Sequence, residues 1–306
     1  MQQSQSRSAN PGRFRRALLP YMLILPVMAW LVALTIFPFV KTLQYSFLGW
    51  VLTRPWHKPF VGFQNYASVL SPRNNIFWNA MANTGLFVAG ALSVELVLGL
   101  WLASLVSRPI KAQKFFVTTL LIPMVISPVV AGLFYRAAFA PEFGLINYFI
   151  KAIGLVHLAP QEGFLGNPRT ALLAAISVDI WQWTPFTFLI LFAGIRSLPN
   201  EPFEAAEIDG SSRMQRFLYV TLPLLRPALL VVILFRAMDA YRIFDVIWIM
   251  TKGGPGKATE VLSVLIYKTA FFYWDIGIST AMSYVMLLIA IASSTMLIRA
   301  LHRETT

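Results

Sequence analysis

The feature that most constrains this chain is a series of apolar runs, each long enough to cross a lipid bilayer. A transmembrane helix needs about 20 consecutive, predominantly apolar residues. Such runs lie at residues 18–40, 82–105, 115–135, 171–193, 227–250 and 281–300. Of the 306 residues, 57% are hydrophobic and 12% are charged, which is typical of a membrane protein and not of a soluble domain. The sequence therefore predicts an all-α membrane protein with six transmembrane helices, a membrane domain over 18–300, and terminal tails at 1–17 and 301–306.

The positively charged residues predict how these spans are oriented. The first run follows a group of arginines and is longer than the apolar core of a signal peptide, which has about 7–15 residues, so we interpret it as a retained span. If the N-terminus lies in the cytoplasm, the inside connections are about twice as rich in lysine and arginine as the outside ones. This predicts a multi-pass protein with a cytoplasmic N-terminus, and it places residues 201–223 in the cytoplasm.

Residues 201–223, EPFEAAEIDGSSRMQRFLYVTLP, form a polar, helix-forming interruption between the fourth and fifth apolar runs. Gly210 stands where the end of a helix favours a residue with positive φ. Ser212 and Gln215 have the S-x-x-Q spacing of a capping box, which marks the start of a second helix. That helix is expected to end near Leu222, because Pro223 lacks the backbone donor of a helix interior. The pattern predicts two short helices joined by a bend, which fits a surface hairpin as well as a docking element.

This segment resembles the cytoplasmic EAA loop of the permease subunits of binding-protein-dependent ABC importers. The matching positions are Glu204, Ala205, Ala206, Asp209, Gly210, Leu222 and Pro223. In that family the loop is the coupling helix, which sits in a cleft on the ATP-binding subunit and carries its motion into the membrane. The resemblance implies a type I importer permease fold with a coupling helix, in which Glu204 and Asp209 meet basic groups of the ATPase. We refer to residues 201–223 as the EAA-like segment.

Ionisable and aromatic residues interrupt the second and fourth apolar runs. An ionisable side chain at mid-depth in a bilayer is costly unless it faces protein or water, so Glu95 is expected to point inward. It would either hydrogen-bond a neighbouring helix or contact a substrate. In the fourth run, Trp181 and Trp183 lie close to Asp179. The two tryptophans fit an interfacial aromatic belt, and they also fit a sugar path, where aromatic faces pack on a pyranose ring and carboxylates bind its hydroxyls.

The fifth run carries four charges of alternating sign, spaced three residues apart. Side chains at this spacing are neighbours on a helix, so each of Arg236, Asp239, Arg242 and Asp245 can pair with the next. Because three residues fall about 60° short of a full turn, the series winds around the helix and cannot face one partner. A structural ion ladder and a contribution to a solute path both remain open. The candidate path residues are Glu95, Asp179, Trp181, Trp183, Asp239, Tyr241, Arg242 and Asp245.

Further motifs resemble those of carbohydrate permeases. They are G-x-x-N-Y at 62–66, F-G-x-x-N at 143–147, W-x-W-T-P-F at 181–186, and an outer loop of Gly253, Gly254 and Pro255 in which Lys252 replaces the small residue expected. The resemblance implies the compact six-span class that imports maltose-like sugars, trehalose or glycerol phosphates. It also implies the partners: a second homologous permease subunit, two ATP-binding subunits that carry ATP and magnesium, an extracytoplasmic sugar-binding protein, and the lipid bilayer of a bacterial or archaeal cytoplasmic membrane.

Other function classes lack their residues in this sequence. There is no cysteine, and His57, His157 and His302 are isolated, so no metal site is expected. No G-x-x-x-x-G-K-[ST] motif is present, so ATP is expected on a separate chain and no cofactor on this one. The net charge of +12 fits cytoplasmic loops better than nucleic acid. A membrane-embedded enzyme would leave the EAA-like segment unexplained, and a secondary transporter would be expected to show two repeated halves.

Overall fold

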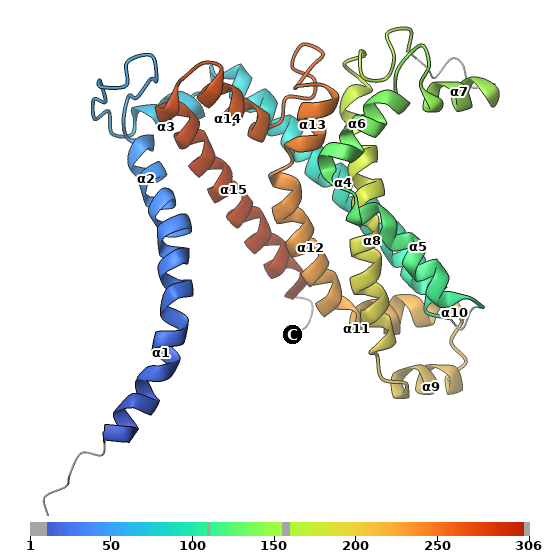
Figure 1. Cartoon of the computed structure of the whole chain (residues 1–306). Helices are drawn as coiled ribbons and strands as arrows, with labels where there is room; N and C mark the ends of the chain where they lie inside the picture. Colours follow the sequence, from blue (N-terminus) through green and yellow to red (C-terminus); the bar gives the residue numbers. More distant parts are fainter. Residues whose placement is uncertain (1–10, 109–110, 155–159, 303–306) are drawn as a thin grey trace, which may run out of the picture.

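The computed structural model describes residues 11–108, 111–154 and 160–302, and every regular element within them is helical (Figure 1). The outermost parts of the two predicted tails, 1–10 and 303–306, lie outside the described residues, as does His157. Four helices are long and apolar enough to cross a membrane, and the number rises to six if each of two bent helix pairs is one span. The predicted fold class, an all-α membrane protein, is confirmed.

The first span is a nearly unbroken helix. It comprises α1 (Pro11–Leu31), a π-helical turn (Val32–Ile36) and α2 (Phe37–Ser46). The π turn precedes Pro38, which has no N–H to donate and whose ring would crowd the preceding turn of an α-helix. The wider turn accommodates this ring, so the helix passes the proline without a sharp kink.

This first helix stands apart from the rest of the molecule (Figure 1). Every side chain from 21 to 40 is exposed. Near the α2 end, the Tyr284 hydroxyl donates a hydrogen bond to the Phe39 carbonyl at 2.6 Å, and the two rings are tilted against each other. The first helix is therefore attached to the bundle near its α2 end, and the apolar side chains along the rest of it are exposed.

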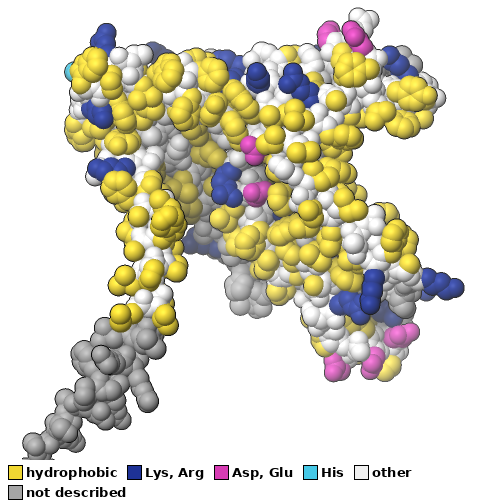
Figure 2. Space-filling model, in the orientation of Figure 1, with side chains coloured by type: hydrophobic (Ala, Val, Ile, Leu, Met, Phe, Trp, Pro, Cys, Tyr) yellow, Lys and Arg dark blue, Asp and Glu magenta, His cyan; other side chains and the backbone are white. Residues whose placement is uncertain are grey.

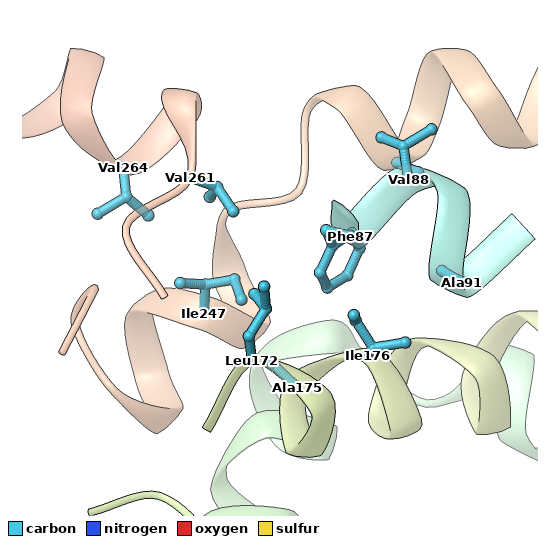
Figure 3. Close-up of a cluster of buried hydrophobic side chains, with 10 residues drawn as sticks. Phe87, Val88, Ala91, Leu172, Ala175, Ile176, Ile247, Val261 and Val264 are labelled. Carbon is cyan, nitrogen blue, oxygen red and sulfur yellow. The ribbon is translucent and has the colours of Figure 1, made fainter. Parts of the chain in front are cut away.

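Two long helices form the centre of the bundle. α4 (Asn75–Val106) and α8 (Ala171–Arg196) lie against each other, and Gly99 permits their close approach because a Cβ there would overlap Thr187. Figure 3 shows the apolar side chains that close one end of this contact, contributed by α4, α8 and later segments: Phe87, Val88, Ala91, Leu172, Ala175, Ile176, Ile247, Val261 and Val264. These helices are the frame on which the charged residues of the bundle are placed.

The third predicted span, 115–135, is broken. α5 (Gln113–Val125) and α6 (Pro128–Ala138) meet at an angle of 91°. The sequence predicts a bend at Pro123 and Pro128, and the break falls just before the second. A residue that precedes a proline favours an extended backbone, and Ser127 has this conformation, whereas Pro123 stays inside α5.

Gln182 of α8 compensates for this break. Its buried side chain donates a hydrogen bond from Nε2 to the Ile126 carbonyl at 2.7 Å. That carbonyl lies at the end of α5, where the proline interrupts the helical hydrogen bonds. A polar residue that interrupts the fourth apolar run thus has a structural partner in the third.

Substituting Gln182 by methionine is expected to destabilise the protein. Gln182→Met preserves the side-chain length but removes the donor to a part-buried carbonyl, which lowers the free energy of unfolding by about 1–2 kcal/mol. The thermal midpoint of the purified protein would report this loss. Ser177→Ala is the matched control, because it removes only a hydrogen bond to Ala174 within the same helix. Equal midpoints for the two variants would contradict the role of Gln182.

The fifth predicted span, 227–250, is interrupted as well. α12 (Arg226–Tyr241) is followed by a short break and by α13 (Asp245–Met250). In the break, the Ile243 carbonyl accepts a hydrogen bond from the Ser263 hydroxyl, so this carbonyl is satisfied outside the helix.

The predicted ion ladder along one helix is therefore wrong in part. Asp245 begins a separate helix, and within the described residues no ion pair joins it to Arg242. The first members of the series do pair as expected, from Arg236 to Asp239 and from Asp239 to Arg242.

The connections gather at two opposite ends of the bundle (Figure 1). α9 (Glu201–Ile208) and α10 (Arg213–Arg216) lie at the same end as the start of α1. The opposite end holds α3 (Gln64–Leu70), α7 (Leu145–Ala152) and α14 (Leu262–Phe271), which precedes the last long helix, α15 (Ile276–His302). This alternation is the one that the predicted topology requires. The sequence predicts only a connection over 251–280, so α14 is an addition.

Candidate functional site

The EAA-like segment folds into two short helices joined by a bend. Gly210, which follows α9, has a φ of +73°, the positive value expected at a helix end. The Ser211 N–H donates to the Ala206 carbonyl at 3.0 Å and closes the end of α9. The capping box is complete, because the Ser212 N–H donates to Gln215 Oε1 at 2.8 Å and the Gln215 N–H donates to Ser212 Oγ at 3.3 Å. The bend at Gly210 and the start of α10 are therefore determined by neighbouring residues in the sequence.

The motif residues of this segment are presented to solvent at the end of the bundle. Those that are exposed are Glu204, Ala205, Asp209 and Gly210, while Ala206 is half-buried. Ile208, which the sequence analysis did not single out, is 86% exposed.

The second helix of the segment runs slightly beyond its predicted end. α10 continues through a π-helical turn (Phe217–Thr221) into α11 (Leu222–Leu224), and this helical stretch meets the fifth span at 64°. Pro223 lies in the first turn of α11, where its missing N–H needs no partner, and the π turn before it gives the ring room. Leu222 and Pro223 are half-buried at this junction. The segment is therefore joined to α12 by a bent helix and not by a loose loop.

A buried ion cluster joins α4, α8 and α12. Arg236 donates through Nε and Nη2 to the two oxygens of Glu95, both at 2.7 Å. The same guanidinium reaches Asp179 at 2.6 Å and Asp239 at 2.9 Å. Arg236 is 2% exposed and Glu95 is 0% exposed, and the ring of Trp183 lies 5.0 Å from the guanidinium carbon. Glu95 thus binds Arg236 of the neighbouring helix α12, which is the first of the two roles that the sequence allows. The second, contact with a substrate, stays a prediction.

The cluster reaches the surface through Asp239. This side chain is 42% exposed, and its second oxygen lies 3.5 Å from Nη2 of Arg242, which is 74% exposed. Figure 2 shows acidic and basic side chains at mid-height of the molecule, within a largely apolar surface. Asp179 is buried, and Trp181 packs against Tyr135 of α6 with ring centroids 5.3 Å apart. Within the ion cluster, Asp239 and Arg242 are therefore the predicted path residues most accessible to solvent.

A cavity is lined by Arg242, the ion-pair partner of Asp239. It has a volume of about 760 Å³ and opens between α12, α14 and α15. Its lining is mostly apolar and aromatic, and it includes Met238, Tyr241, Arg242, Phe244, Tyr267 and Phe271. Phe244 and Tyr267 also pack with Trp248, so the rings have fixed orientations. Cavities of this size hold small organic ligands.

The predicted outer loop is tightly held. Thr259 donates to the Gly254 carbonyl at 2.7 Å and shares a hydrogen bond of 2.6 Å with Thr251. Gly253 has a φ of +90°, and a Cβ there would lie 3.0 Å from Lys268 Nζ. Lys268 in turn pairs with the buried Glu260 at 2.6 Å. The sequence analysis missed this pair, because Glu260 precedes α14 and the eight-residue separation from Lys268 is not a spacing that makes side chains neighbours on one helix.

Residues 95–305 match the family model described as binding-protein-dependent transport system inner membrane component. The matched region contains both the EAA-like segment and the buried ion cluster. The chain belongs to this family. It is the multi-pass permease component of an ABC transport system, located in the inner membrane, and it is not itself catalytic.

Individual relatives cover nearly the whole chain. The trehalose/maltose transport system permease protein MalF of Thermococcus litoralis is 36% identical over 265 residues, which are 87% of this chain and 86% of that protein. The trehalose transport system permease protein SugA of Mycobacterium tuberculosis is 32% identical over 90% of this chain and 86% of its own length. The sulfoquinovosyl glycerol transport system permease protein SmoG of Agrobacterium fabrum is 30% identical, with 94% and 91% covered.

A solved structure has the same fold. A chain of a bacterial ABC transporter involved in the import of the acidic polysaccharide alginate superposes with a TM-score of 0.81 at 22% identity. The match covers 96% of this chain and 99% of that one. The arrangement of helices in Figure 1 is therefore that of an ABC transporter permease.

Proposed function

We propose that this chain forms half of the translocation path of a sugar importer. The three relatives above are named for trehalose/maltose, trehalose and sulfoquinovosyl glycerol, which supports a carbohydrate as the solute. A second homologous permease subunit forms the other half, and an extracytoplasmic sugar-binding protein delivers the solute. Two ATP-binding subunits supply ATP and magnesium, because this chain has no motif for binding them.

The observation that carries the proposed path is the aromatic-lined cavity on α12, which is lined by Arg242, the ion-pair partner of Asp239. A pyranose packs its C–H face on aromatic rings such as those of Tyr241 and Tyr267, while its hydroxyls exchange water for hydrogen bonds to charged groups. Charged side chains within a bilayer are tolerated mainly where they meet water or a partner, and Asp239 is placed to meet both.

The EAA-like segment is proposed as the coupling element. It lies at the end of the bundle that the positive residues assign to the cytoplasm, where the ATP-binding subunits are. Glu204, Asp209 and the exposed Ile208 offer acidic and apolar contacts for a partner surface. The opposite end, which carries the Gly253, Gly254 and Pro255 loop, then faces the sugar-binding protein.

Asp239→Asn is the test of the path. In the complete complex, uptake of labelled trehalose or maltose per folded complex is expected to fall about 10- to 100-fold, because a hydrogen bond to a charged group is lost. Assembly should stay normal, since Asp239 is only partly buried. Glu142→Gln, at an exposed carboxylate of the outer connection, is the control and should leave uptake unchanged.

A structural role for Asp239 predicts another pattern. The yield of complex would fall in Asp239→Asn and recover when Arg242→Gln is added, while transport per folded complex would stay constant. That result would remove Asp239 from the proposed path.

A further inference from the structure

The F-G-x-x-N motif at 143–147 fixes the short helix α7 at the end of the bundle opposite the EAA-like segment. Gly144 lies where the chain turns from α6 into α7, and a Cβ there would overlap the carbonyl oxygens of Ala138 and Ala140. The Ala140 carbonyl accepts hydrogen bonds from the Gly144 N–H at 3.0 Å and from Asn147 Nδ2 at 2.8 Å. Gly144 and Asn147 therefore set the direction in which α7 leaves α6.

α7 points sideways from the bundle, at the level where the spans end (Figure 1). Asn147 is buried, and Ile146 packs against the apolar cluster between α6, α8 and α13, so these two residues form its inner side. The apolar side chains away from this inner side are between 56% and 68% exposed; they are Leu145, Tyr148, Phe149 and Ile153. Figure 2 shows hydrophobic side chains gathered at this place. The described chain therefore leaves one face of α7 uncovered.

This uncovered face is a continuous apolar arc. At about 100° per residue it covers about 140° of the helix surface. Its members, in order around the helix, are Tyr148, Ala152, Leu145, Phe149 and Ile153. Lys151 lies at the edge of the arc, next to Tyr148. An apolar face with a tyrosine and a lysine at its edge is typical of a helix that lies in the plane of a membrane interface, since both side chains have an apolar body and a polar tip.

The surroundings of α7 favour lipid as the partner of the arc. α7 follows α6, the second helix of the broken third span, and α6 itself exposes Val130, Leu133 and Phe134. The arc thus continues an apolar surface that belongs to a membrane span. With eight residues, α7 is too short to cross the bilayer.

We propose that α7 is a lipid anchor: it lies in the membrane interface, with Leu145, Phe149 and Ile153 toward the acyl chains, and holds the end of α6 at the bilayer surface. Burial of these side chains in the acyl region is favourable because it removes apolar surface from water. The inference does not depend on the solute or on the proposed path.

A spin label can test this placement, because the chain contains no cysteine. Phe149→Cys puts a nitroxide in the arc, and Lys151→Cys, at the edge of the arc on the same helix, is the matched control. The complete complex, with cysteine-free partner subunits, would be held in nanodiscs of phosphatidylethanolamine and phosphatidylglycerol. Power-saturation EPR would then measure how often the label collides with oxygen, which concentrates in acyl chains, and with a nickel chelate, which stays in water.

The ratio of the oxygen to the nickel collision rate is expected to be about tenfold higher at 149 than at 151, because the apolar face of an interfacial helix is buried about 5–10 Å into the headgroup and acyl boundary. Ile153→Cys should give the same high ratio as Phe149→Cys. Addition of the loaded binding protein should leave these ratios unchanged. The substituted side chains are exposed, so labelling leaves the packed side of α7 intact.

Three outcomes would overturn the lipid anchor. Equal ratios at 149 and 151 would mean that water covers the arc. Low collision rates with both reagents at 149 would mean that another subunit covers it. A high ratio at 149 that falls when the binding protein docks would make α7 part of the docking surface for that protein. None of these results would bear on the proposed sugar path.

Discussion

Arg236→Met is expected to destabilise the permease more than any other single substitution in the membrane domain. It leaves the carboxylates of Glu95 and Asp179 buried without a cation, and breaking a buried pair in this way costs about 3–5 kcal/mol. The bonds that are lost join α4, α8 and α12, so the helices would separate or admit water. The yield of monodisperse complex and its thermal midpoint are the measurements.

Two further variants separate the loss of charge from the loss of side-chain packing. Arg242→Met makes the same chemical change at a side chain that is 74% exposed, where an ion pair contributes about 1 kcal/mol or less. Adding Glu95→Gln and Asp179→Asn to Arg236→Met removes the unpaired charges and should restore more than half of the lost midpoint. If Arg236→Met is as stable as Arg242→Met, the cluster does not hold the three helices together.

Gly210→Val is expected to abolish most of the ATP-driven uptake while the complex still assembles. A Cβ at Gly210 would meet no atom within 4 Å, so the effect comes from the backbone alone. At a φ of +73° a β-branched residue is strained by about 1–2 kcal/mol, and the bend between α9 and α10 would open. Uptake should fall tenfold or more, together with the stimulation of ATP hydrolysis by the loaded binding protein.

Each substitution in the EAA-like segment has a matched control variant. Gly210→Asn should keep most of the uptake, because asparagine adopts positive φ more readily than valine does. Glu204→Ala should lower uptake, whereas Glu201→Ala, in the same turn of α9, should not. If Gly210→Val assembles normally and shows wild-type uptake and ATPase stimulation, the coupling role of the EAA-like segment is contradicted.

The sidedness of the EAA-like segment can be tested separately. A thiol introduced by Met214→Cys should react only from the cytoplasmic side.

The parts of the fold that could be predicted from the sequence are those set by local signals. The apolar runs are found as membrane-length helices or bent helix pairs, because bilayer thickness alone dictates their length. The capping box of Ser212 and Gln215 and the positive φ of Gly210 were also predicted, since each depends on a few neighbouring residues. The same holds for the pair between Arg236 and Asp239, one helical turn apart.

What could not be predicted depends on residues that are distant in the chain. Glu95 and Arg236 are separated by 141 positions, and nothing in either apolar run identifies the other as its partner. The break at Arg242 depends on Ser263, which binds a carbonyl that a continuous helix would have used. The role of Gln182 likewise appears only once Ile126 is beside it. Single-sequence periodicity carries no information on such pairings.

The isolation of the first helix has a consequence for how the protein is made. Its backbone hydrogen bonds are internal, and its side chains from 21 to 40 are all exposed, with the Phe39 ring in contact with Tyr284 near the α2 end, so its helical structure can form in lipid as soon as it is synthesised. Helices that insert independently can associate afterwards, in a second stage. α1 and α2 can therefore anchor the nascent chain in the bilayer before the ribosome has produced Tyr284, whose hydroxyl later binds the Phe39 carbonyl near the α2 end.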